Sequence, residues 1–99
     1  MKVLIEAPFT INNADEKWIK EQVEGLSKLN DRMTQAEVYF KLDDGTIANG
    51  VMSEIRLFVP GKDAFASNTA SDFKDAFSGA LDKVKRQLKK AKGKNTDYA

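Results

Sequence analysis

The sequence predicts an α+β fold, in which two helices cover one face of a four-stranded, mostly antiparallel sheet in the order βαβββα. Two patterns predict this fold. Residues 35–42 alternate between apolar and polar side chains, as a strand with one buried face does. Residues 71–92 repeat apolar side chains at helical spacing instead. Because the chain has 99 residues, we expect one domain over residues 1–94 and a short C-terminal tail over residues 95–99.

The first two elements are a short strand and a helix. Residues 2–7 are mostly apolar and predict the strand. Asn13 and Glu16 have the spacing of a capping box, in which the Asn13 side chain caps the helix. An apolar helix face then extends from Trp18 to about Lys28. We assign Trp18 and Phe40 to the core.

Three strands are expected next, separated by turns. The first covers residues 35–42 and is broken by the Asp-Asp-Gly run at residues 43–45. The second covers residues 51–59, and the third covers residues 63–69 after the turn at Pro60-Gly61. The pattern leaves open whether the first strand of the chain pairs in parallel with a neighbour.

The last helix is expected over residues 71–92. Ser71 is a suitable N-cap, and Gly93 is a natural stop. Such a helix is roughly 33 Å long at about 1.5 Å per residue, which is more than a small domain needs. We therefore expect its last third to extend past the core as a rigid basic end.

Charge is distributed unevenly along the chain. The net charge is +1, but residues 83–99 hold seven basic residues against one acid, a net charge of +6, and residues 1–82 hold nine against fourteen, a net charge of −5. Runs of charged residues often form only a solvent-exposed surface that binds no partner. Here Val84 and Leu88 stay in helical register among the lysines, which favours a basic helix that binds phosphate backbones.

Residues 72–90 resemble the last helix of the bacterial ribosome hibernation-promoting factors. This family is also called ribosome-associated inhibitor, ribosomal subunit interface protein or sigma-54 modulation protein. Lys74 replaces the tyrosine that the family has in the opening of this helix, and Lys28 resembles the basic position at the end of its first helix. The chain is similar to the short members. The matching positions are Asp72, Ala76, Asp82, Lys83, Arg86, Gln87, Leu88 and Lys90.

The resemblance implies a ribosome-binding domain that silences translation. It implies binding to the small subunit in the decoding channel through rRNA phosphates, with tRNA and mRNA sites blocked during stationary phase or other stress. Whether the protein promotes ribosome dimers or keeps ribosomes monomeric is left open, as is self-association of the free protein. The rRNA-binding residues we expect are Lys83, Arg86, Lys89, Lys90 and Lys94, then Lys28 and Lys85.

Other functions stay open at this stage. The element order is also similar to the double-stranded RNA-binding domain, but that module carries its lysines near the start of the last helix, where this chain has Asp72 and Asp75. A general RNA-binding domain is a further alternative, and so is a module that docks an acidic partner such as a transcription factor. The open face of the sheet is expected to carry Tyr39, Met52, Arg56, Phe58 and Phe65, which suits base stacking, self-association or another protein contact.

Composition argues against several classes of function. The chain has no histidine and no cysteine, so the usual general base, thiol nucleophiles and thiolate metal sites are missing. We expect no enzyme activity, cofactor, metal or small-molecule substrate. The sequence shows neither a membrane span nor a signal-peptide pattern. A cytoplasmic protein is the simplest expectation.

Overall fold

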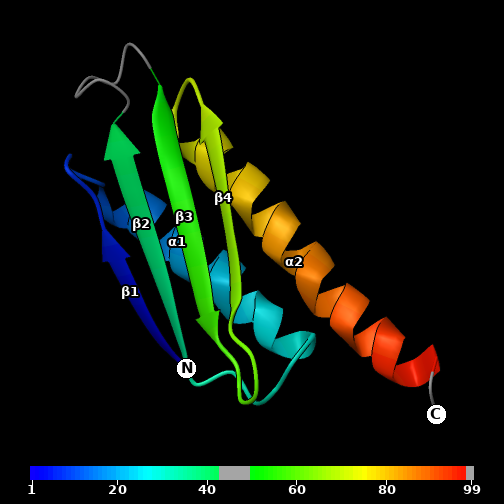
Figure 1. Cartoon of the computed structure of the whole chain (residues 1–99). Coiled ribbons are helices and arrows are strands. Elements are labelled where there is room, and N and C mark those ends of the chain that lie inside the picture. The colour runs from blue at the N-terminus through cyan, green and yellow to red at the C-terminus, as the bar shows by residue number, and fades with distance from the viewer. Residues whose placement is uncertain (43–49, 98–99) are drawn as a thin grey trace.

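The expected α+β fold is present in the computed structural model, which describes residues 1–42 and 50–97 (Figure 1). The turn predicted at residues 43–45 lies outside the described residues. The strand boundaries agree with the predicted ranges to within one residue. The elements are β1 (Lys2–Glu6), α1 (Asn13–Glu24), the 3-10 turn η1 (Gly25–Lys28), β2 (Gln35–Leu42), β3 (Val51–Phe58), β4 (Ala64–Ala70) and α2 (Phe73–Asp97).

The four strands form one sheet in the order β1-β2-β3-β4. β1 pairs in parallel with β2, with Val3 opposite Ala36. The other two pairs are antiparallel, and Ile55 of β3 lies between Val38 of β2 and Ala66 of β4. The parallel pair, which the sequence left open, follows from the helical crossover that returns the chain to the same end of the sheet. β1 and β4 are therefore the two edge strands.

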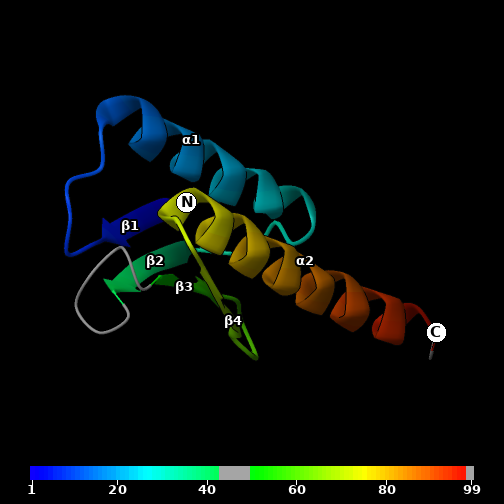
Figure 2. The ribbon, with the colours of Figure 1, turned by 90° about the horizontal axis from the view of Figure 1, so that it is seen from above.

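Both helices lie on one face of the sheet and enclose the core with it (Figure 2). Val38, Ile55, Leu57 and Phe77 are buried there. Trp18 is half-buried and meets the Phe77 ring edge-on, with the ring centroids 5.3 Å apart. Each large side chain that is fully removed from water contributes about 1.5–3 kcal/mol, so this layer holds α1 and α2 in place.

Both predicted helix starts were one residue off. Asn12, and not Asn13, caps α1, because its Oδ1 accepts a hydrogen bond from the Asp15 amide at 2.8 Å. At α2 the Asp72 carboxylate accepts from the Asp75 amide at 2.9 Å, so Asp72 caps the helix in place of Ser71. In both cases two neighbouring side chains are able to cap, and the second of two candidates is not always the one used: the first caps α1 and the second caps α2.

Gly93 does not end α2, which continues to Asp97. Glycine within a helix costs only about 1 kcal/mol relative to alanine, and the lysines and alanine around Gly93 are good helix formers. The expectation that α2 extends past the core is confirmed, since its last turns project beyond the sheet (Figure 2).

Candidate nucleic-acid interface

The second half of α2 presents a cluster of cations held by a buried stripe. Leu81, Val84 and Leu88 are buried against the sheet. The basic side chains between them therefore point away from the core: Lys83, Arg86, Lys89 and Lys90 are exposed, and Lys85 is half-buried. The apolar stripe thus fixes the direction in which five cations are displayed.

Arg86 is oriented by an acidic neighbour one helical turn earlier. Its Nη2 lies 2.8 Å from Oδ2 of Asp82, and both side chains are more than half exposed. Such a surface ion pair contributes at most about 1 kcal/mol. A phosphate is able to replace the Asp82 carboxylate at little cost, and its oxygens can accept two parallel hydrogen bonds from the Arg86 guanidinium.

Lys83 has a structural contact that the sequence did not predict. Its Nζ donates to the Ser67 carbonyl at 2.9 Å. One turn later the Gln87 amide makes two bonds with the Phe65 backbone: Nε2 donates to the carbonyl at 2.6 Å, and Oε1 accepts from the N–H at 3.1 Å. Lys83 and Gln87 thereby cover the outer edge of β4. An ammonium group has three donors, so Lys83 still has donors for a phosphate.

Lys28 lies at the same end of the molecule as the second half of α2. Two hollows share Asn30 and Val59 there. The first, of about 400 Å³, is also lined by Lys62, Gln87 and Lys90 and by one acid, Asp63. The second, of about 490 Å³, is also lined by Lys28 and Arg32 and by one acid, Asp31, so cations outnumber acids in each hollow. The structure therefore joins Lys28 to the helix cations and adds two basic residues to them.

Arg32 and Lys62 were missed in the sequence because each stands alone beside an acid, Asp31 or Asp63. The order and direction of the elements would have identified Arg32 and Lys62 as neighbours of the α2 cations. α2 returns antiparallel to β4, so its second half lies beside the β3–β4 turn and the end of η1 (Figure 1). We call the joined area the basic surface, and it comprises Lys28, Arg32, Lys62, Lys83, Lys85, Arg86, Lys89 and Lys90. The Lys94 side chain lies outside the described part of α2, and its role stays a prediction.

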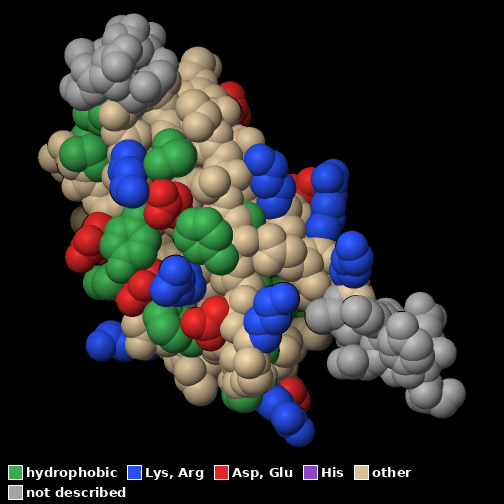
Figure 3. Space-filling model, in the orientation of Figure 1, with side chains coloured by type: hydrophobic (Ala, Val, Ile, Leu, Met, Phe, Trp, Pro, Cys, Tyr) green, Lys and Arg blue, Asp and Glu red, His purple; other side chains and the backbone are tan. Residues whose placement is uncertain are grey.

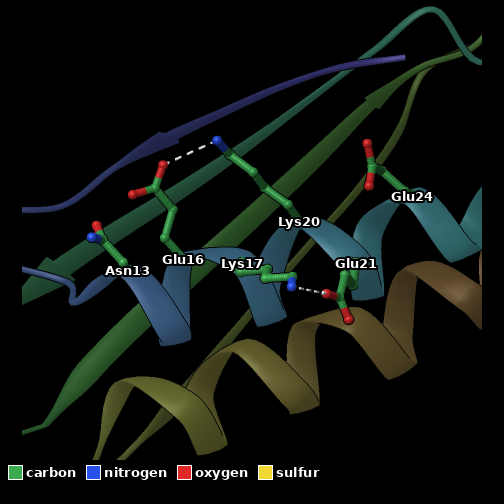
Figure 4. Close-up of a pocket in the computed structure, with 6 residues that line it drawn as sticks. All are labelled: Asn13, Glu16, Lys17, Lys20, Glu21 and Glu24. Carbon is green, nitrogen blue, oxygen red and sulfur yellow. Dashed lines mark ion pairs between the residues drawn. The ribbon is translucent and has the colours of Figure 1, made fainter.

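The outward face of α1 has a different character. Lys20 pairs with Glu16 at 3.0 Å, and Lys17 pairs with Glu21 at 4.0 Å (Figure 4). Glu24 and these four residues line an open hollow of about 530 Å³. Because three acids outnumber two lysines that are already paired, this hollow does not suit a phosphate.

The open sheet face carries the side chains expected there, as the alternating burial of β2 and β3 confirms. Phe65 is 44% exposed, and the Arg56 guanidinium lies 5.6 Å from the centre of its ring. Lys41 is paired with Glu54 at 3.1 Å. Acidic, basic and apolar side chains alternate over this face, whereas basic side chains line the side where α2 lies (Figure 3). The sheet face thus lacks a basic excess for phosphates.

The hydroxyl of Tyr39 shows how the acids shape this face. A hydrogen bond to the Glu37 carboxylate raises the pKa of the Tyr39 phenol above its ordinary value, with smaller contributions from burial and from the negative charges of Glu37 and Glu6. Gln35 also donates to Glu37, at 3.1 Å. An anion placed here would meet these carboxylates first.

A family model described as "Sigma 54 modulation protein / S30EA ribosomal protein" matches residues 8–96. The chain belongs to this family. The match covers α1, nearly all of α2 and the strands β2, β3 and β4 but not β1, and it confirms the resemblance to the hibernation-promoting factors that the α2 motif predicted. Membership supports a ribosome-associated role and gives no indication of catalysis. No curated protein matches the sequence.

Solved structures share the family's fold. A ribosomal subunit interface protein from Coxiella burnetii has a TM-score of 0.81 at 15% identity, over 94% of this chain and 99% of the other. The N-terminal domain of Protein Y from Thermus thermophilus has a TM-score of 0.75 at 23% identity, over 91% and 98%. At these identities the similarity shows the arrangement of elements alone.

One departure from the family motif has a clear structural use. Lys74, which replaces the expected tyrosine, places its Nζ 2.9 Å from Oδ1 of Asp15. The pair links the first turn of α2 to α1.

Among the described residues, no cluster of three or more metal-binding side chains occurs. No helix in the described ranges is long and apolar enough to cross a membrane.

Proposed function

We propose that this protein binds the small ribosomal subunit in the decoding channel and silences translation by blocking the sites of tRNA and mRNA. The observation that carries the proposal is the basic surface. Cations from α2, the end of η1, the following loop and the β3–β4 turn meet at one end of the fold. Phosphate backbones are the ligands that such a surface attracts most strongly.

Family membership supports the ribosome as the target. The family description names a ribosomal protein, and the Coxiella burnetii structure is titled a ribosomal subunit interface protein. A cytoplasmic location follows from this target.

Blocking a channel requires no chemistry, only a rigid body that binds RNA on one side. The buried stripe of α2 holds its backbone in place before binding, so less conformational freedom is lost in the complex. Arg86 can hold a phosphate with two parallel hydrogen bonds, and the lysines add point charges. The net charge of −5 over residues 1–82 opposes binding of nucleic acid elsewhere on the molecule.

Chemical probing of rRNA in purified small subunits, with and without the protein, tests the location. We expect protection at the nucleotides that tRNA and mRNA also protect, together with reduced tRNA binding and reduced translation in a cell-free system. Protection elsewhere with normal tRNA binding would contradict occlusion. A complex that survives nuclease treatment of a lysate would favour the alternative of a protein partner.

A further inference from the structure

The two edges of the sheet are protected differently. Gln87 and Lys83 cover the outer edge of β4. On β1 the Lys2 amide donates to the Thr34 carbonyl at 3.3 Å, so the backbone groups of Lys2, Leu4 and Glu6 face β2. In a strand the groups alternate, so the N–H and C=O of Val3 and Ile5 point out of the sheet. No described residue hydrogen-bonds to them.

The free edge of β1 borders a hollow that apolar side chains line together with Glu16 and Lys20 of α1. The hollow has a volume of about 380 Å³ and is lined by residues of β1, of the loop that follows and of α1. Val3, Ile5, Ala7, Phe9 and Ile11 supply its apolar wall. Met1, at 41% exposure, is one of the two large apolar side chains exposed in the described residues. An edge strand whose outward backbone groups have no described partner is suited to the addition of another strand.

We propose that β1 pairs antiparallel with β1 of a second copy of this chain, around a two-fold axis at Leu4. In this register Lys2 faces the second copy's Glu6, and Val3 faces the second copy's Ile5. Leu4 faces its own equivalent. The backbone groups of Val3 and Ile5, to which no described residue of the same chain bonds, are those that an antiparallel pair of this register bonds. Four backbone hydrogen bonds and two opposite-charge pairs result.

The surrounding residues fit the same register. Met1 of the second copy falls opposite Ala7, beside the hollow that Phe9 and Ile11 line. With the axis at Val3, Lys2 would face Leu4, and Glu6 would lose its charged partner. With the axis at Ile5, Glu6 would face Leu4, and Lys2 would lose its charged partner. The register at Leu4 is therefore favoured. A two-fold pairing of this kind is closed and does not grow into fibres.

Pairing through β1 leaves the basic surface free. β1 lies at the edge of the sheet opposite β4 and α2 (Figure 1). The dimer therefore carries its two basic surfaces on its outer sides. The inference is independent of the ribosomal function and is tested without ribosomes.

A cysteine at the symmetry axis tests the pairing directly, because the natural chain has no cysteine. Facing residues of a non-hydrogen-bonded antiparallel pair have Cα atoms about 4.5 Å apart, which is within the range of a disulfide. We expect Leu4→Cys to form a disulfide-linked dimer on mild oxidation. The matched control is Phe65→Cys on the covered edge strand β4. A monomeric Leu4→Cys protein, or equal linkage of both variants, would overturn the proposal.

Charge exchange tests the register without touching the core, since Lys2 and Glu6 are both exposed. Sedimentation equilibrium at high protein concentration measures dimerisation of the wild type. Lys2→Glu or Glu6→Lys alone replaces two attractive pairs by two repulsive ones and is expected to weaken the dimer about tenfold. The double exchange, or a mixture of the two single variants, is expected to restore it. If the wild type stays monomeric, or the double exchange fails to restore the dimer, the pairing is wrong.

Discussion

Gly79 marks a close approach of α2 to β4. A Cβ atom at this position would overlap the amide group of Asn68, whose Nδ2 reaches the Ala76 carbonyl at 3.5 Å. Asn68 is on the core side of β4 and half-buried, so it has little room to move. The absence of a side chain at Gly79 is therefore a packing requirement, although glycine is unfavourable inside a helix.

We predict that Gly79→Ala lowers the free energy of unfolding by about 1–2 kcal/mol, because the overlap outweighs the gain in helix propensity. Denaturant unfolding measures it. In an Asn68→Ala background the same change should be neutral or stabilising, since the obstacle is gone. Gly25→Ala is the control, because nothing lies within 4 Å of a Cβ there. Equal effects of Gly79→Ala in both backgrounds would refute the proposed contact.

Tyr39 reports the acidic character of the open sheet face through its titration. Its hydrogen bond to Glu37, with the nearby charges, raises the pKa of the phenol in the folded state. The neutral phenol is therefore favoured by folding. This contribution to stability is fully present below the unfolded pKa and is lost as the pH rises through the folded pKa.

We predict that Glu37→Gln lowers the pKa of Tyr39, because the negative acceptor becomes neutral. Tyrosinate absorbance during a pH titration measures this pKa. The chain has two tyrosines, so a Tyr98→Phe background isolates the signal of Tyr39. An unchanged titration curve would show that Glu37 does not control the phenol.

At the scale of elements, the edge of β4 depends on side chains of α2. The Phe65 N–H points away from β3 and is bonded to Gln87, whereas Ala66 lies in the ladder opposite Ile55. Without Gln87 the edge would be open to solvent and to other strands.

We predict that Gln87→Ala destabilises the fold by about 1–2 kcal/mol, because two hydrogen bonds are lost. Amide hydrogen exchange locates the effect. Exchange at Phe65 should accelerate well beyond the global change, while Ala66 keeps its protection relative to the core. A uniform acceleration of both amides would mean that Gln87 acts only through overall stability.

The strands were predictable from the sequence because their alternation is local. β2 begins and ends at the predicted residues. Its alternate side chains Ala36, Val38 and Phe40 are buried in the core, so the alternation in the sequence follows the strand directly. The ends of the helices were harder to predict. Asn12 stands beside Asn13, and Ser71 stands beside Asp72, so local chemistry does not choose the cap.

From the charge pattern the site was predictable only where its charges are adjacent in sequence, and Lys28 was predicted through the family resemblance. The cations from Lys83 to Lys90 form one run, and all of them except the half-buried Lys85 lie exposed as expected. Arg32 and Lys62 join them only through the topology of the sheet, and their acidic neighbours hide them in the sequence. The bond from Lys83 to Ser67 depends on a contact between elements that no local pattern shows.

At the scale of the whole molecule, the two surfaces on which the proposals rest lie on opposite sides of the fold. The basic surface is on the side of α2, and the free edge of β1 is on the other (Figure 1). Binding through the basic surface should depend steeply on salt. If about five phosphates are contacted, log affinity falls with log salt at a slope of about −3.5 to −4.5.

The central claim is that the basic surface binds the ribosome, and sedimentation with purified small subunits over a range of salt tests it most directly. Arg86→Gln/Lys89→Gln/Lys90→Gln removes three cations from the surface. Lys83 is left intact, because it also covers β4. The matched control, Lys17→Gln/Lys20→Gln/Lys41→Gln, removes the same charge from side chains that are paired with acids elsewhere.

We predict that the wild type and the control sediment with the subunits with the same steep salt dependence. The surface variant should bind at least about tenfold more weakly, with the slope reduced by about 2 to 3, because each lost phosphate contact removes close to one unit. Equal binding of all three proteins, or a wild-type slope near about −1, would contradict the account.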